Sequence, residues 1–321
     1  MPFNRRTPTK LHLFLLALAV ALTLAGCGGP YPQSAMDPAG PFAADLQWLF
    51  ALIVAIATVI FVVVEAVLIY AVFRFRRRPG DGIPVQVHGN MRLEVAWTIA
   101  PAVVLALIAI PTVAMTFQTY EPLEKPSMTI KVNGWQWWWE YQYPQEYGNI
   151  NTANELIIPA GETIALGLES RDVIHSYWVP PLGGKRDVHP GHVNPLWLKA
   201  DRPGEYYGQC AEFCGDSHAY MRLRVIALSR PDFDAWVQRM TRPAANPVGA
   251  AGQGAQLFQS KGCVGCHTIA GTQAQGKVAP NLTLFGERRT IAAAMMPNTP
   301  ENLRKWLKNP PGVKPGAKMP N

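Results

Sequence analysis

The chain has 321 residues and a formal net charge of +7, with 29 Lys and Arg against 22 Asp and Glu. This length suits about two soluble domains, although part of it is apolar enough to lie in a membrane. The basic residues are concentrated in a short loop between two apolar runs and in the C-terminal part, and the sequence carries no nucleic-acid-binding motif. The charge therefore gives no reason to expect a nucleic acid as a partner.

Residues 1–26 are typical of an export signal. Arg5, Arg6 and Lys10 precede an apolar run, Leu11–Ala25, which is too short to span a bilayer. Small residues then lead directly into Cys27, as at the processing site of a bacterial lipoprotein. We expect cleavage before Cys27 and attachment of lipid to its sulfur. An ordinary signal or anchor with an incidental cysteine is the alternative.

The cysteines leave no pair for a structural disulfide. One suits lipidation, two lie in a loop rich in sulfur and imidazole, and two belong to a heme-attachment motif. An exported protein without spare cysteines must be held together by its core and its metals. The five are Cys27, Cys210, Cys214, Cys263 and Cys266.

Two apolar runs at about residues 47–73 and 95–117 are each long enough to cross the ~30 Å hydrocarbon core as a helix. The short loop between them is rich in arginine, which the positive-inside rule assigns to the cytoplasm. Everything after residue 117 should then lie outside.

Glu65 is a lone charge in the first run, where an ionisable residue is a candidate for function. Snorkelling, or pairing with a partner subunit, is an equal alternative.

Residues 121–240 contain short β-rich runs separated by Pro and Gly, a spacing that suggests a β-sandwich or barrel. A stretch rich in Pro, Ala and Gly at 241–251 suggests a linker. Residues 252–321 then form a third unit, which begins with an expected helix over Gly252–Ser260.

The stretch from residue 210 to residue 221 concentrates ligands for soft metals. Thiolates, imidazole and thioether of this kind suit copper, and the spacing does not suit a closed zinc site. Two cysteines can bridge two metal ions, while histidine and methionine can supply weaker terminal ligands. A disulfide between the two cysteines is the alternative. The stretch contains Cys210, Cys214, His218 and Met221, and His175, in an expected strand, is the candidate ligand from elsewhere.

The chain from the membrane hairpin to about Leu228 resembles cytochrome c oxidase subunit II and its CuA domain. The most specific motifs are residues 184–191 (GKRDVHPG) and 202–210 (RPGEYYGQC). The resemblance implies a cupredoxin-like barrel that holds two copper ions. Its ligands would be the bridging Cys210 and Cys214, the terminal His175 and His218, the weak ligand Met221 and the backbone carbonyl of Glu212. The Glu212 carboxylate would also help to bind a magnesium ion at the border with subunit I. His189 and His192 are interpreted as loop residues rather than ligands.

The resemblance assigns roles to two further residues. Trp137, in an aromatic run, matches the tryptophan at which electrons enter the copper centre, although Trp138 stands where the family has tyrosine. Core packing is the alternative for this run. Glu94, at the start of the second span, matches a glutamate at the mouth of a proton channel into subunit I. A favourable charge at a helix N-terminus is the alternative for Glu94.

Cys263-Val-Gly-Cys266-His267 is a c-type heme attachment signature. Residues 314–320 (KPGAKMP) resemble the methionine loop of class I cytochromes c, so Met319 is predicted to be the sixth iron ligand, with Met295 and Met296 as rivals. Such Met–His ligation raises the reduction potential and suits electron transfer. Residues 298–307 are expected to form a helix. That family usually continues past the methionine loop into a last helix, so we expect either that the sequence is truncated at Asn321 or that a partner covers the exposed face.

We therefore predict a multidomain membrane protein with a two-helix transmembrane hairpin, an all-β cupredoxin-like CuA domain and an all-α class I cytochrome c domain. By resemblance it would be subunit II of a bacterial terminal oxidase. It would relay electrons from an external cytochrome c or other donor through heme c and CuA to subunit I, for oxygen reduction coupled to proton translocation. Subunits I and III are the expected partners, in the inner membrane with the soluble domains on the periplasmic side.

Two other functions agree less well with the sequence. A stand-alone membrane electron carrier would not need the segments around Glu94 and Lys185–Gly191, which resemble contacts with subunit I. A nitrous-oxide reductase also uses CuA but needs a second, histidine-rich copper site, and seven histidines, most already assigned, cannot build one. Quinol-oxidase homologues lose the copper ligands that are present here.

Overall fold

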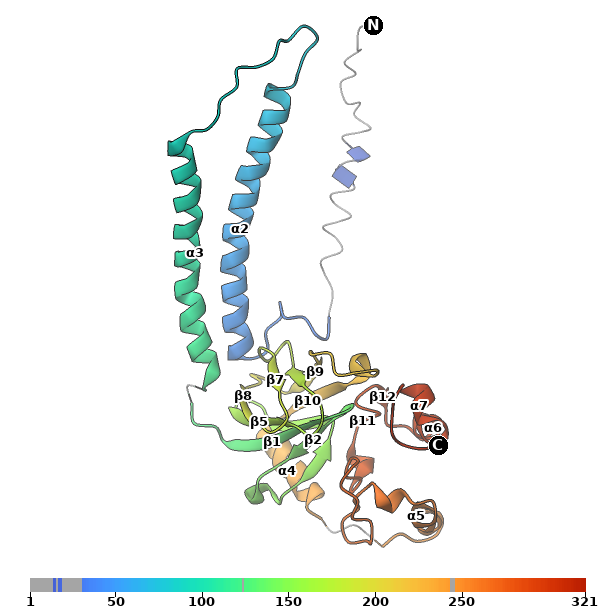
Figure 1. The fold of residues 1–321 in the computed structure, drawn as a ribbon. Helices are drawn as coiled ribbons and strands as arrows, with labels where there is room; N and C mark the ends of the chain where they lie inside the picture. The colour runs from blue at the N-terminus through green and yellow to red at the C-terminus, as the bar shows by residue number, and fades with distance from the viewer. Residues whose placement is uncertain (1–13, 16, 19–30, 123, 243–245) are drawn as a thin grey trace.

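The computed structural model describes residues 14–15, 17–18, 31–122, 124–242 and 246–321. Cys27 and nearly all of the expected export signal lie outside these residues. Figure 1 shows a long helical hairpin above a β domain, with a C-terminal unit (residues 250–321) packed against the side of that domain.

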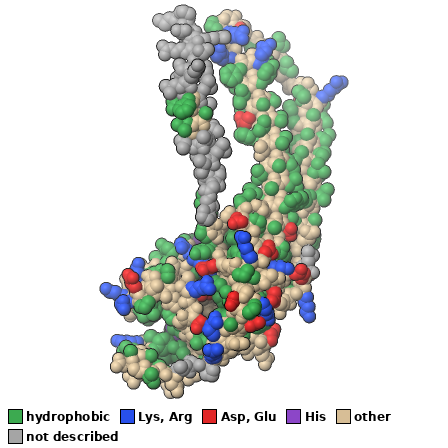
Figure 2. Space-filling model, turned by 180° about the vertical axis from the view of Figure 1, so that it is seen from behind, with side chains coloured by type: hydrophobic (Ala, Val, Ile, Leu, Met, Phe, Trp, Pro, Cys, Tyr) green, Lys and Arg blue, Asp and Glu red, His purple; other side chains and the backbone are tan. Residues whose placement is uncertain are grey.

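The hairpin consists of α2 (Pro41–Arg74) and α3 (Met91–Tyr120), and both are long and apolar enough to span a membrane. Almost none of their apolar side chains are buried within the chain, so these side chains are available to lipid. Figure 2 shows hydrophobic side chains along the hairpin and Lys and Arg side chains gathered at its far end. Each helix extends beyond the apolar run that predicted it.

The base of the hairpin is joined to the β domain by aromatic packing. Phe42, at the start of α2, stacks on Trp197 with 5.0 Å between ring centroids. The indole N–H of Trp197 donates to the carbonyl of Thr119 near the end of α3, at 3.1 Å. A Cβ on Gly183 would lie 2.9 Å from the Phe42 ring, so a glycine is needed for this close approach.

The β domain is a sandwich of two five-stranded sheets. One sheet has the order β3 (Asn151–Ala153), β2 (Trp138–Gln142), β1 (Met128–Trp135), β5 (Ile164–Ser170), β8 (Asn194–Leu198). The other has the order β4 (Glu155–Pro159), β10 (Arg222–Leu228), β9 (Gly204–Cys210), β6 (His175–Trp178), β7 (Arg186–Val188). Most pairs are antiparallel, but β1 with β5 and β4 with β10 run parallel.

Alternating side chains fill the space between the sheets. In β5, Ile164, Leu166 and Leu168 are buried and the residues between them are not. Trp139 and Tyr141 from the aromatic run are fully buried, so core packing does account for part of that run. This is the pattern of a strand with one face in a core.

Helix α4 (Arg230–Met240) was not predicted. It begins where the Ser229 side chain accepts a hydrogen bond from the Asp232 N–H, and it buries Phe233 and Trp236 against the sandwich. Its sequence held the signal, because Ser followed three residues later by Asp is a helix start.

The C-terminal unit is mainly helical. Its elements are α5 (Ala250–Ser260), the 3₁₀ turns η3 (Cys263–Gly265) and η4 (Phe285–Glu287), the two-stranded β11 (Thr290–Ile291) and β12 (Met296–Pro297), α6 (Pro300–Lys308) and α7 (Pro310–Val313). α5 begins inside the expected linker. The Thr299 side chain caps α6 by accepting from the Asn302 N–H.

Phe233→Ala should destabilise the β domain by about 3–5 kcal/mol, because it empties a fully buried aromatic site. The measurement is the denaturant midpoint of the β domain in the full chain, followed by tryptophan fluorescence. Asp234→Ala is the matched control on the same helix. Its carboxylate is half-exposed and pairs with Arg230, so its loss should cost less than about 1 kcal/mol. Equal midpoints for the two variants would contradict the packing of α4.

Candidate functional site

Neighbouring strands bring the predicted copper ligands together. Cys210 ends β9, and Met221 immediately precedes β10, the antiparallel partner of β9. The Cys210 N–H donates to the Met221 carbonyl at 2.9 Å, which closes the base of the loop. His175 begins β6, the strand on the other side of β9.

The two thiols lie at the centre of this cluster, with their Sγ atoms 3.7 Å apart, and both are free. Each thiol has one imidazole Nδ1 beside it, His175 at 3.9 Å from Cys210 and His218 at 3.6 Å from Cys214. The other two predicted ligand atoms are also adjacent: the Met221 sulfur lies 3.9 Å from the Cys214 sulfur, and the Glu212 carbonyl lies 3.2 Å from the Cys210 sulfur.

This donor set fits a pair of copper ions. Two sulfurs stand between two imidazoles, with a thioether on one side and a carbonyl on the other, and all are types that copper accepts. His175 and Met221 are fully buried and both cysteines are nearly so. The Glu212 side chain is exposed, so only its backbone faces the cluster.

Asp172 holds His175 in position and was missed by the sequence reasoning. Its Oδ1 lies 2.9 Å from His175 Nε2, so the other ring nitrogen, Nδ1, is the one directed at Cys210. Burial alone would lower the pKa of His175, but the hydrogen bonds with Asp172 and Cys210 raise it. A carboxylate three residues before a ligand histidine was the available signal.

The two thiols have opposed acidities. The contact between the two sulfurs lowers the pKa of Cys210 and, together with burial, raises the pKa of Cys214. Because copper is bound by thiolates, loading of this site releases whatever protons the two sulfurs still carry.

Trp137 joins the copper loop to the turn between β1 and β2. Its indole N–H donates to the Cys214 carbonyl at 3.0 Å, and the Gln136 side-chain amide donates to the same oxygen at 2.9 Å. Trp138 instead stacks on Trp135, with 5.6 Å between centroids. Trp137 is thus the tryptophan of the run that donates a hydrogen bond to the copper loop.

The heme-attachment motif lies in the C-terminal unit. The His267 Nδ1 lies 2.7 Å from the carbonyl of Pro280, which leaves Nε2 free for a metal. Burial lowers the pKa of His267, and this favours the neutral form that binds iron. Cys266 is exposed and Cys263 is half-buried, as residues that bond a large external group would be.

The methionine loop of the C-terminal unit lies on the copper loop. The Ser217 hydroxyl donates to the Pro315 carbonyl at 2.5 Å, and the Lys314 ammonium donates to the Trp137 carbonyl. A Cβ on Gly316 would lie 2.5 Å from the Trp137 ring, so the backbone of this loop rests on the indole. Burial lowers the pKa of Lys314 to about 7.

The remaining candidates lie apart from the cluster. Glu94 Oε1 accepts from the N–H of Asn90, and the Asn90 side chain accepts from N–H groups of the first turn of α3, so Glu94 helps to cap this helix. His189 contacts Asn194 at 3.0 Å in the β7–β8 connection. Met319, Met295 and Met296 are all half-buried, and their burial does not distinguish them as iron ligands.

Asp172→Asn should weaken copper binding about 10- to 100-fold, because it removes the charged partner that orients His175. Competition with a copper chelator measures the affinity. Glu169→Gln is the control, since Glu169 is a nearby carboxylate that pairs with Arg171 instead. An unchanged affinity in the Asp172 variant would show that His175 is oriented without it.

Models of three families match the chain. They are described as "Cytochrome C oxidase subunit II, transmembrane domain" over residues 30–115, "Cytochrome C oxidase subunit II, periplasmic domain" over 144–228, and "Cytochrome c" over 251–321. The three matched ranges follow the order of hairpin, β domain and C-terminal unit.

Relatives extend along nearly the whole chain. It is 41% identical over 318 residues to the "Cytochrome c oxidase subunit 2" of Alkalihalophilus pseudofirmus, a match that covers 96% of this chain and 90% of the relative. The protein of the same name from Bacillus sp. (strain PS3) is 41% identical over 330 residues, covering 96% and 91%. The crystal structure of the periplasmic domain of subunit II of cytochrome oxidase from Bradyrhizobium japonicum is 33% identical, with a TM-score of 0.36, and covers 37% of this chain and 96% of that one.

Proposed function

Because the chain belongs to the cytochrome c oxidase subunit II family and carries a C-terminal cytochrome c domain, we propose that it relays electrons within a terminal oxidase. The relay takes electrons from an external donor to heme c, then to the CuA centre, and then to subunit I, where oxygen is reduced. This chain supplies the two electron-transfer sites and the membrane anchor.

Bound copper and heme iron each supply one-electron redox chemistry. Cys210 and Cys214 would bridge the copper ions, with His175, His218, Met221 and the Glu212 carbonyl completing the ligands. Cys263 and Cys266 would bind the heme covalently, with His267 and Met319 as axial ligands.

The observation that carries the proposal is the contact between the two sites. Lys314 and Gly316, in the loop that contains Met319, lie against Trp137. Trp137 in turn donates to the carbonyl of Cys214. A short path of packed groups thus leads from the methionine loop through one indole to a copper-ligand residue, which supports Trp137 as the place where electrons enter.

The membrane hairpin supports the output side of the relay. With the arginine-rich loop in the cytoplasm, the β domain lies on the periplasmic side, close to the membrane and to the subunits embedded there.

We extend the proposal to subunits I and III as partners, to a magnesium ion shared through the Glu212 carboxylate, and to Glu94 at the mouth of a proton channel used in proton translocation. Lipidation of Cys27 after signal cleavage would add a second anchor.

Trp137→Leu should slow electron transfer from heme c to CuA by about tenfold or more. The reason is that it removes the indole that aligns the two sites, and misplaced reacting groups react more slowly. Flash-induced reduction of heme c in the purified oxidase measures the rate. Trp138→Phe is the control, because Trp138 stacks on Trp135. If the Trp137 variant transfers electrons as fast as this control, the path through the indole is wrong.

Met319→Ala should abolish the near-infrared methionine–iron band and lower the reduction potential of heme c, while the heme stays attached through Cys263 and Cys266. Absorption spectra and a redox titration measure both effects. Met296→Ala, in β12, should keep the band. A band that persists in the Met319 variant would assign the iron to another ligand.

A further inference from the structure

We propose that Glu155 is the residue that fixes the C-terminal unit in one docked position on the β domain. This inference rests on the proposed function, because the docked position is the one in which the methionine loop meets Trp137. Glu155 is a positioning residue in this proposal and touches neither redox site.

The Glu155 carboxylate is almost fully buried, with 3% of its surface exposed, although it begins the outer strand β4. One oxygen accepts from the backbone N–H of Thr290 at 2.6 Å and from its hydroxyl at 2.5 Å. The other accepts from the backbone N–H of Arg289 at 3.1 Å. All three donors come from the C-terminal unit, so the undocked chain would leave this charge without them.

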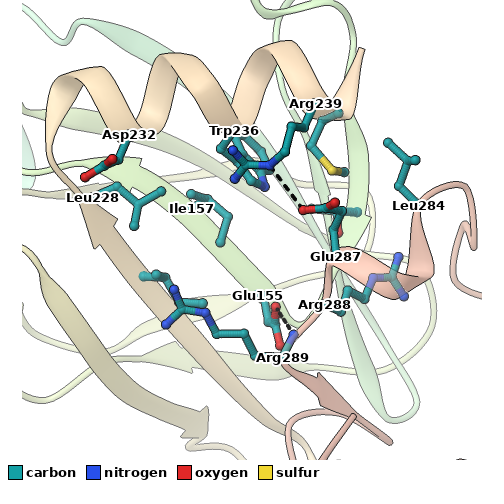
Figure 3. A pocket seen from close by; sticks show the side chains of 13 residues that line it. Glu155, Ile157, Leu228, Asp232, Trp236, Arg239, Leu284, Glu287, Arg288 and Arg289 are labelled. Carbon is teal, nitrogen blue, oxygen red and sulfur yellow. Dashed lines mark hydrogen bonds and ion pairs between the residues drawn. The ribbon is translucent and has the colours of Figure 1, made fainter. Parts of the chain in front are cut away.

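Hydrogen bonds to a charged acceptor are the strong kind, and they are strongest where water is excluded. Figure 3 shows Glu155 beside the chain segment that contains Arg289, with a dashed line for the hydrogen bond between them. The same charge is costly to bury unpaired. Glu155 therefore favours one position of the segment 289–290 over every other position that the linker permits.

The chain next to this contact has an unusual backbone that the docked position accommodates. Ala292, Ala293 and Ala294 all have positive φ, between 54° and 61°. Residues other than glycine retain this conformation only where their surroundings fix it. Here Arg224 of β10 donates to the Ala294 carbonyl at 3.3 Å, and Arg224 is itself held over the Tyr207 ring and beside Glu205.

The part of the interface between α4 and the C-terminal unit is loosely packed. A cavity of about 460 Å³ adjoins Glu155 and lies between α4 and the C-terminal unit. The ion pair between Arg239 and Glu287 at its rim, 3.3 Å long, is about 40% exposed on each side and so contributes little. With this space between α4 and the C-terminal unit, the position of the unit near Glu155 depends on polar contacts rather than on apolar packing against α4.

The test compares Glu155→Gln with Glu162→Gln in the purified oxidase. Glu162 carries the same chemistry on the same domain, but its partner is Arg230, also in the β domain, at 3.1 Å. Hydrogen exchange at the backbone amides of Arg289 and Thr290 reports docking, and flash-induced transfer from heme c to CuA reports its consequence.

We expect Glu155→Gln to speed exchange at these two amides about tenfold or more, given the strength of charge-assisted hydrogen bonds. Transfer from heme c to CuA should slow and become dependent on solvent viscosity, because the unit must then diffuse back to its position. The spectra and reduction potentials of both centres should stay as in the control, which a general loss of folding would not allow.

Thr290→Val gives a second test from the other side of the contact. It removes the hydroxyl donor but keeps the N–H, so its effect should be in the same direction and smaller.

The proposal is overturned if hydrogen exchange and electron transfer in Glu155→Gln match those of Glu162→Gln. If exchange responds but heme c never reduces CuA even in the unaltered chain, Glu155 still positions the unit and the proposed relay fails.

Discussion

The shape of the copper loop depends on the two hydrogen bonds that the Cys214 carbonyl accepts from Trp137 and Gln136. They tie the loop after β9 in one sheet to the turn after β1 in the other. A buried carbonyl without partners is costly, so the loop is stable only where both sheets are in place. The thiol pair, which is adjacent to this carbonyl, is therefore positioned by the whole sandwich rather than by the loop alone.

This arrangement suits electron transfer because it leaves the ligands little freedom to move. His175 is at the start of β6, an interior strand, and its ring is held by a hydrogen bond with Asp172, while the backbones of Cys210 and Met221 are hydrogen-bonded to each other. A site whose ligands are fixed by rigid elements and supporting contacts keeps its geometry when its charge changes. Burial of both cysteines also excludes the water that would otherwise reorganise around them.

Sequence reasoning reached the copper cluster because five of its residues lie within twelve positions and the sixth, His175, belongs to a recognisable strand. It missed Asp172 and α4, although both had local signals, a carboxylate three residues before a histidine and a Ser229–Asp232 helix start. Sequence reasoning could not predict how the C-terminal unit docks on the β domain. Glu155 meets Thr290 across 135 residues, and no pattern within either segment marks the other as its partner.

Contacts at two separate places on the β domain restrict the orientation of the C-terminal unit more than a contact at either place alone. A single contact near β4 would leave the unit free to pivot, and the methionine loop could then leave Trp137. A single contact at Trp137 would have to hold Lys314 buried at a low-dielectric site, which is unfavourable for a cation. Glu155 accepts a hydrogen bond from Thr290 at one end, and Ser217 donates one to Pro315 at the other. The unit has one orientation in which the hydrogen bonds at both ends are formed. The linker then needs only to keep the unit near, and the orientation comes from the contacts.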